Sequence, residues 1–168
     1  MNDYQASRTT FPKMPEEIFT LWLDARIKRK GWPPQGIVWQ GYLCGKTIDF
    51  WQKLNWTKQE VFLSKELIGR LSWPVLTQLI NGNVNGANNV VMAYVEDSRE
   101  RFAKIMAYAQ ANHNIPGTII LLKTGQQYEI VDGNHRLAAL IWLQETFEAR
   151  KKLIYPQAAW IGECETGK

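Results

Sequence analysis

The stretch that decides the fold runs from Tyr128 to Ala139 and reads Tyr-Glu-Ile-Val-Asp-Gly-Asn-His-Arg-Leu-Ala-Ala. Its first four residues have the β-branched and aromatic character of a strand, and the residues after Asn134 have the apolar spacing of a helix. The pattern therefore predicts a strand that turns at Gly133 directly into a helix, with Asn134 as the N-cap. The first N–H groups of a helix lack partners and carry the positive end of its dipole, so this turn is a candidate anion site.

Two further side chains mark the first turn of this helix. His135 and Arg136 stand where a cation is unfavourable to the helix dipole. Their position indicates that they face an anion, and the planar guanidinium of Arg136 can bind a phosphate in two places. An ordinary strand–turn–helix joint, with Asp132 and Asn134 as caps, explains the same pattern. The residues alone leave both interpretations open.

Outward from the turn, the second half of the chain predicts alternating strands and helices. Residues 128–131 form the return strand of a hairpin whose first strand covers 119–122. A helix over 98–112, with one apolar face, precedes the hairpin. We expect a strand over 90–95 before that helix and a last strand over 156–161.

The first half is rich in tryptophan, and most of the eight tryptophans of the chain lie there. We expect them to form the core of a small helical part, whereas the alternative is a set of stacking platforms for nucleic-acid bases. The patterns predict a helix over 15–30, a strand or irregular core over 37–43, and a helix that begins at a capping box over 57–60. The polar run over 81–86 predicts an exposed loop that ends regular structure.

Taken together, these segments predict one α+β domain over 1–168. A mostly helical, Trp-rich part covers 1–84, and a nucleotide-binding core, in which helices flank a small sheet, covers 88–162.

Composition places the chain among ordinary globular proteins, with 45% hydrophobic and 21% charged residues. No apolar run reaches the roughly 20 residues of a membrane helix, and the first residues have no apolar core of the signal-peptide kind. We therefore expect a cytoplasmic protein with no membrane span, in which Cys44 and Cys164 are reduced. The net charge of +4 is compatible with an anionic partner. The basic clusters at 26–30 and 150–152 are either DNA phosphate contacts or solvated helix ends.

The segment Val131-Asp132-Gly133-Asn134-His135-Arg136-Leu137-Ala138-Ala139, after a helix and a hairpin, resembles the ParB/sulfiredoxin superfamily. The resemblance covers about residues 88–162 and implies the fold of the ParB-like nucleotide-binding domain. Sulfiredoxin activity is excluded, because Asn134 stands where that branch has a nucleophilic cysteine, and an amide supplies no thiolate. In size and arrangement the chain resembles a plasmid-encoded branch that inhibits conjugative or T-DNA transfer (fertility inhibition). This branch implies an ATPase and DNase that binds DNA.

The resemblance implies ATP or another nucleoside triphosphate as the ligand, with Mg²⁺. Arg136 and the backbone of Gly133–His135 would hold phosphates, with Asp132, Asn134 and Arg99 as further nucleotide contacts. Catalysis would use His135 as a proton carrier or phosphate donor, together with Arg136, Asp132 and Glu129. Asp132 and Glu129 are also the candidate Mg²⁺ ligands. Strand alternation places these two carboxylates on opposite faces unless the turn twists. Arg99 and Arg101, near the start of the helix over 98–112, are possible second phosphate contacts, and a solvated helix face is the favoured interpretation of both.

Two other functions fit the same residues. The chain could be a non-catalytic module that binds nucleotide or another protein and blocks the DNA-transfer machinery, or a kinase with the ParB fold. A non-catalytic module would not hydrolyse a triphosphate, whereas an ATPase would. A kinase would be identified by a phosphorylated product.

Overall fold

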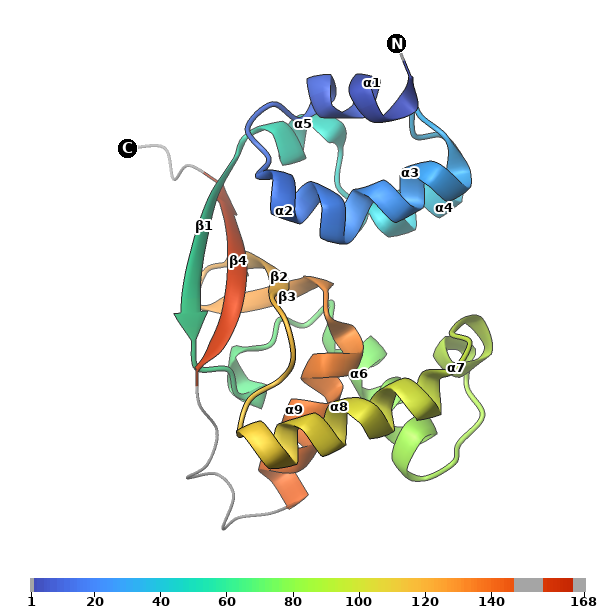
Figure 1. The fold of residues 1–168 in the computed structure, drawn as a ribbon, viewed down its shortest axis with the longest axis vertical. Helices are drawn as coiled ribbons and strands as arrows, with labels where there is room; N and C mark the ends of the chain where they lie inside the picture. The colour runs from blue at the N-terminus through green and yellow to red at the C-terminus, as the bar shows by residue number, and fades with distance from the viewer. Residues whose placement is uncertain (1, 147–155, 165–168) are drawn as a thin grey trace. The chain divides into compact units, whose positions relative to one another are not determined.

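The computed structural model describes residues 2–146 and 156–164 and shows a mixed α+β fold (Figure 1), which confirms the predicted class. The helices, in chain order, are α1 (Asp3–Thr10), α2 (Glu16–Ile18), the π-helical η1 (Phe19–Asp24), α3 (Ala25–Lys30), α4 (Gly36–Tyr42), α5 (Ile48–Gln52), the 3₁₀ turn η2 (Lys65–Leu67), α6 (Trp73–Val84), α7 (Val90–Tyr94), α8 (Ser98–Asn112) and α9 (Asn134–Thr146). The strands are β1 (Leu54–Val61), β2 (Ile119–Thr124), β3 (Gln127–Asp132) and β4 (Gln157–Cys164), in the sheet order β1–β4–β2–β3.

The chain divides into two compact units, residues 1–57 with 160–168 and residues 58–159. The boundary expected between 84 and 88 falls within the second unit, in the segment that joins α6 to α7. The basic cluster at 150–152 lies outside the described residues.

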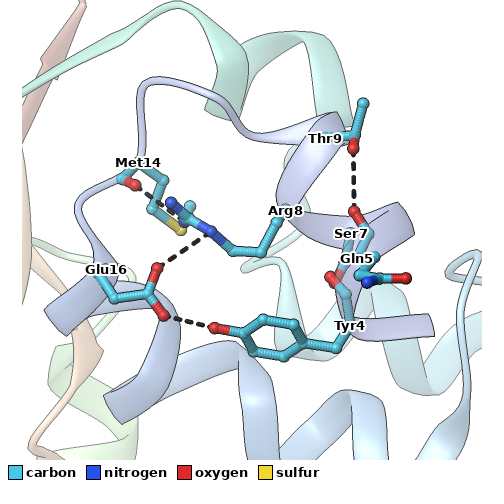
Figure 2. Close-up of polar contacts among 7 residues, drawn as sticks. All are labelled: Tyr4, Gln5, Ser7, Arg8, Thr9, Met14 and Glu16. Atoms are coloured by element: carbon cyan, nitrogen blue, oxygen red, sulfur yellow. Dashed lines mark hydrogen bonds and ion pairs between the residues drawn. The ribbon is translucent and has the colours of Figure 1, made fainter. Parts of the chain in front are cut away.

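In the first unit, α1 is tied to the start of α2 by polar contacts (Figure 2). The Arg8 guanidinium forms an ion pair with Glu16, Nε to Oε2 at 3.2 Å, and donates to the carbonyl of Met14 at 3.0 Å. The hydroxyl of Tyr4 donates to the other carboxylate oxygen of Glu16. These contacts hold the two helices together across the turn at 11–15.

Three tryptophans lie in the core of this unit, as expected, together with aliphatic and phenylalanine side chains. Trp22 and Trp51 are each 1% exposed, and their ring centroids lie 4.4 Å apart. Trp39 is also buried. The Trp51 indole N–H donates to the carbonyl of Leu43 at 3.2 Å, so this buried polar atom is satisfied.

The second unit is built around the β2–β3 hairpin and the helix that follows it. Ile119 to Leu121 of β2 are fully buried, and so is the α9 segment from Leu137 to Ile141. α9 packs against both α6 and α8 (Figure 1). Burial of each large aliphatic side chain contributes about 1.5–3 kcal/mol, so this packing stabilises α9 against the rest of the unit.

The predicted strand over 90–95 is wrong, because residues 90–94 form α7. The Asn89 side chain accepts a hydrogen bond from the Met92 N–H at 3.0 Å and so caps the helix. The Asn89 amide also donates to the carbonyl of Gln78 in α6 at 2.9 Å. A short apolar run does not distinguish a strand from a helix, and here the cap and its tertiary anchor favour the helix.

Three other local predictions need correction. Residues 57–60 lie in β1, an edge strand, where backbone pairing outweighs a capping-box pattern. Residues 37–42 belong to α4, and α6 continues through 81–84 before Asn85 ends it. The helices over 15–30 and 98–112, the hairpin and the last strand are confirmed within a few residues.

Candidate functional site

The turn between β3 and α9 depends on Gly133. Its φ is +107°, a region that residues with a side chain rarely adopt. A Cβ at this position would lie 2.7 Å from Cγ2 of Ile119, so the fold also leaves no space for one. The carbonyl of Gly133 accepts the first helical hydrogen bond, from the Leu137 N–H at 2.9 Å. Asn134 is therefore the first helical residue and not the predicted N-cap.

Arg136 joins the turn to the segment that leads into β2. Its Nη2 donates to Oδ2 of Asp132 at 2.8 Å, and its Nη1 donates to the carbonyls of Pro116 and Thr118 at 3.3 and 2.9 Å. The side chain is 19% exposed. These contacts use three of the five guanidinium N–H donors and leave two for another partner.

His135 turns toward α8. Its Nε2 lies 3.0 Å from the hydroxyl oxygen of Ser98, the first residue of α8, which is 3% exposed. The same hydroxyl donates to Oδ1 of Asn83 in α6 at 3.1 Å. His135 is thus anchored by groups from two neighbouring helices.

The electrostatics of the turn are dominated by positive charge. Burial of the ring, followed by the charge of Arg101, lowers the pKa of His135 from 6.5 to about 4. Burial also lowers the pKa of Arg136, the charge of Arg101 adds to that shift, and Asp132 opposes it. At neutral pH the imidazole is therefore uncharged, and the two guanidinium groups carry the positive charge near the first turn of α9.

A register shift in the hairpin changes the faces of the two β3 carboxylates. Glu129 pairs with Leu122, whereas Asp132 pairs with Ile120, so Val131 is an extra residue in β3. Directly paired residues share a face, and Leu122 and Ile120 lie on the same face of β2. The shift therefore places Asp132 on the same face as Glu129, which simple alternation did not predict.

The carboxylate of Glu129 is nevertheless hydrogen-bonded to the residues just before α6. It accepts hydrogen bonds from the N–H groups of Leu71 and Ser72 at 3.0 and 2.7 Å and from the Ser72 hydroxyl at 2.6 Å. A Cβ at Gly69 would lie 2.2 Å from Oε1 of Glu129, so only glycine leaves room for this carboxylate. These contacts join β3 to the positive end of α6.

Arg99 lies against the other end of α6. Its Nε and Nη2 atoms approach the carbonyls of Gly82 and Gly86 at 3.5 and 3.4 Å. The structure thus brings Asp132, Gly133, Asn134, His135 and Arg136 together at one turn and engages Glu129 and Arg99 with α6. No group of three or more His, Cys, Asp or Glu side chains suited to a metal ion occurs among residues 2–146 and 156–164.

The partners of these side chains were missed from the sequence. Ser98 contacts His135, which lies 37 residues away in the sequence, and Asn83 contacts Ser98 in turn. Ser72 contacts Glu129, which lies 57 residues away. Nothing in the local pattern of Ser72 or Ser98 indicates these partners.

Comparison of the chain with protein-family models, curated proteins and solved structures gave no match. Within the described part of the chain, every helix is too short or too polar to cross a bilayer.

Proposed function

We propose that this chain binds a nucleoside triphosphate by its phosphates at the β3–α9 turn and hydrolyses the terminal phosphate. The observation that carries the proposal is the Arg136 guanidinium in the first turn of α9, which keeps N–H donors beyond its contacts with Asp132, Pro116 and Thr118. The positive charge of Arg101 on α8 also acts on this turn. The helix dipole is already positive there, and Asp132 is the acidic partner that Arg136 contacts. An anionic ligand relieves this charge excess, and phosphate fits the N–H groups of a helix start.

The two unused N–H donors of Arg136 suit a phosphate oxygen. Its other donors support the backbone before β2, so substitution of Arg136 disturbs the fold and the ligand site together. Arg101 is exposed and lies on α8, so it is the better residue for testing ligand binding.

The Mg²⁺ expected with a triphosphate fits Asp132 better than Glu129. Both carboxylate oxygens of Glu129 already accept hydrogen bonds from Leu71 and Ser72, just before α6. In Asp132, the hydrogen bond from Arg136 goes to Oδ2. Mg²⁺ commonly combines one or two carboxylates with phosphate oxygens and water. When bound, it would neutralise phosphate charge, and Asp132 is the residue that would hold it.

Calorimetric titration of ATP, CTP, GTP and ADP with Mg²⁺ into Arg101→Gln tests the binding proposal. The matched control is Lys104→Gln, which removes an equal charge from the same helix at a residue paired with Glu100. We expect Arg101→Gln to weaken triphosphate binding about tenfold or more, since a hydrogen bond to a charged group contributes about 1.5–3 kcal/mol. Equal effects of the two substitutions, or no binding by the unmodified protein, would contradict the proposal.

Phosphate release distinguishes the three functions that share this site. We expect His135→Gln to lower kcat about 10²–10⁴-fold with little change in KM if His135 handles a proton during the reaction. Binding without hydrolysis would favour the non-catalytic module, and a phosphorylated acceptor would identify a kinase.

DNA binding, DNase activity and inhibition of DNA transfer stay predictions from the family resemblance. In the α3 cluster, Lys28 pairs with Asp24 at 2.7 Å and Arg29 donates to the hydroxyl of Tyr42 at 2.7 Å. These contacts agree with a solvated helix end. If the cluster contacts DNA phosphates, affinity will fall steeply with salt because bound counterions are released.

A further inference from the structure

A chain of hydrogen bonds through three helices determines which ring nitrogen of His135 carries the proton. It begins in α6, where the Asn83 amide Nδ2 donates to the carbonyl of Leu79 at 2.8 Å. It continues from the Ser98 hydroxyl to Oδ1 of Asn83 at 3.1 Å and ends with Nε2 of His135 at 3.0 Å from the same hydroxyl.

The orientation of the Asn83 amide follows from its contact with Leu79. If the amide were turned over, its oxygen would face the Leu79 carbonyl oxygen at 2.8 Å, which would put two acceptors together. The Asn83 oxygen therefore faces Ser98. A serine hydroxyl has one hydrogen. Oδ1 of Asn83 at 3.1 Å receives it in preference to Sδ of Met92 at 3.5 Å, because a thioether sulfur is a weak acceptor.

His135 must then donate to Ser98. If Ser98 instead gave its hydrogen to His135, Oδ1 of Asn83 would face the hydroxyl oxygen with no hydrogen between them. The two oxygens lie 3.1 Å apart, where two acceptors repel each other, and Ser98 is almost fully buried while Asn83 is half-buried. One arrangement satisfies all the groups, and in it the proton of the neutral imidazole is on Nε2.

We propose that Asn83 and Ser98 are positioning residues that hold His135 protonated on Nε2, so that Nδ1 is the ring atom that accepts a proton. Nδ1 is bonded to Cγ of the ring and so lies on the side nearer the backbone of the first turn of α9. The low pKa of His135 agrees with a neutral ring at pH 7. The assignment of the proton rests on geometry alone, whereas its use in catalysis rests on the proposed function.

In triphosphate hydrolysis, Nδ1 takes one proton from the attacking water. The water oxygen forms a bond to the terminal phosphorus as the bond to the leaving phosphate oxygen breaks, and the imidazolium then returns the proton to solvent. Neutral His135 therefore acts on water and does not serve as a cationic phosphate contact.

Nitrogen-15 NMR of the full-length protein at neutral pH tests the tautomer without any ligand. The chain has two histidines, so His113→Asn assigns the ring signals of His135. We expect the unprotonated ring nitrogen of His135 to be Nδ1. A spectrum in which Nε2 is the unprotonated nitrogen would overturn the proposal.

Asn83→Ala provides the sharper test, because it removes the stronger acceptor, keeps the Ser98 hydroxyl and leaves it a choice between Nε2 of His135 and the weakly accepting sulfur of Met92. The hydroxyl then turns to donate to Nε2, and we expect the major tautomer to change to Nδ1–H. Ser98→Ala removes the acceptor for Nε2–H, and we expect it to give a mixture of tautomers. An unchanged spectrum in folded Asn83→Ala would refute the positioning role.

Kinetics separate this inference from the proposed function. If the protein hydrolyses a triphosphate, Asn83→Ala should lower kcat about 10²–10⁴-fold and leave KM nearly unchanged. If it hydrolyses none, the proposed function and the catalytic use of Nδ1 both fail, while the NMR result still decides the tautomer.

Discussion

Glu129 and Asp132 are acidic residues of one strand whose carboxylates have different partners. Glu129 accepts three hydrogen bonds from the start of α6, whereas Asp132 pairs with Arg136 within the turn. A residue that looked catalytic in the sequence thus has a clear structural role, because a carboxylate at a helix start satisfies N–H groups that lack helical partners.

Glu129→Gln should lower the free energy of unfolding by about 1–3 kcal/mol, because the charge-assisted bonds to Leu71 and Ser72 become weaker. Urea unfolding measures the loss. Glu145→Gln is the control, since its ion pair with Lys65 is exposed and contributes about 0–1 kcal/mol. Losses of the same size would show that the contacts of Glu129 with α6 are weak.

His135 makes stability depend on pH in a predictable direction. Its pKa of about 4 in the folded chain lies below the ordinary value of 6.5. Between these pH values the unfolded chain binds a proton that the folded chain does not. The contribution of His135 to stability is therefore fully present above pH 6.5 and is lost as the pH falls toward 4.

We therefore expect His135→Gln to lose less stability than the unmodified protein between pH 7 and pH 5. The glutamine amide can still donate to Ser98 but does not titrate in this range. Urea unfolding of both proteins at the two pH values measures the difference, with His113→Gln as the control. Equal losses in the unmodified protein and His135→Gln would mean that His135 is not the group responsible.

At the scale of elements, short helices and strands depend on neighbours that are distant in the sequence. α7 has the apolar composition of a strand, yet Asn89 caps it and holds it to α6. The extra residue Val131 in β3 similarly changes the face of Asp132 just before the turn. Both features arise from pairing and packing that a local pattern does not contain.

Asn89→Ala should destabilise α7 locally by about 1 kcal/mol, the usual contribution of an N-cap. Hydrogen exchange at the amides of Met92 and Ala93 should become faster. Asn88→Ala, at an exposed neighbour, is the matched control. If both variants exchange alike, the Asn89 cap does not hold the helix.

For the whole molecule, the two compact units predict a localised response to ligand. Every candidate site residue lies within 58–159, whereas most tryptophans lie within 1–57. A ligand that binds only the folded state stabilises the part that holds it. The units should therefore differ in how strongly a triphosphate protects them.

Hydrogen exchange with saturating Mg²⁺–ATP should slow at the amides of 132–137 and at the start of α8. We expect little change over 1–57. Protection of similar size in both units, or strongest in the first, would place the ligand elsewhere. Exchange with inorganic triphosphate in place of ATP shows how much of the protection comes from the phosphates alone.

Much of the second unit could be predicted from sequence because its signals are local. The hairpin, the turn at Gly133 and the helices over 98–112 and 134–146 follow from apolar spacing and from a glycine between two periodic segments. The prediction was poorer where a segment was short. Residues 37–42, 57–60 and 90–95 have patterns that suit more than one structure, and tertiary pairing or capping decided between them.

The sequence by itself determined that the chain is an α+β protein with a strand–glycine–helix turn bearing His135 and Arg136, since these features depend on residues close in the chain. Tertiary structure alone decided the partners of those residues. Pro116 and Thr118 hold Arg136, Ser98 holds His135, and the start of α6 holds Glu129. The physical reason is that hydrogen bonding and desolvation act over a few ångströms in space, whereas these partners lie many residues apart in sequence.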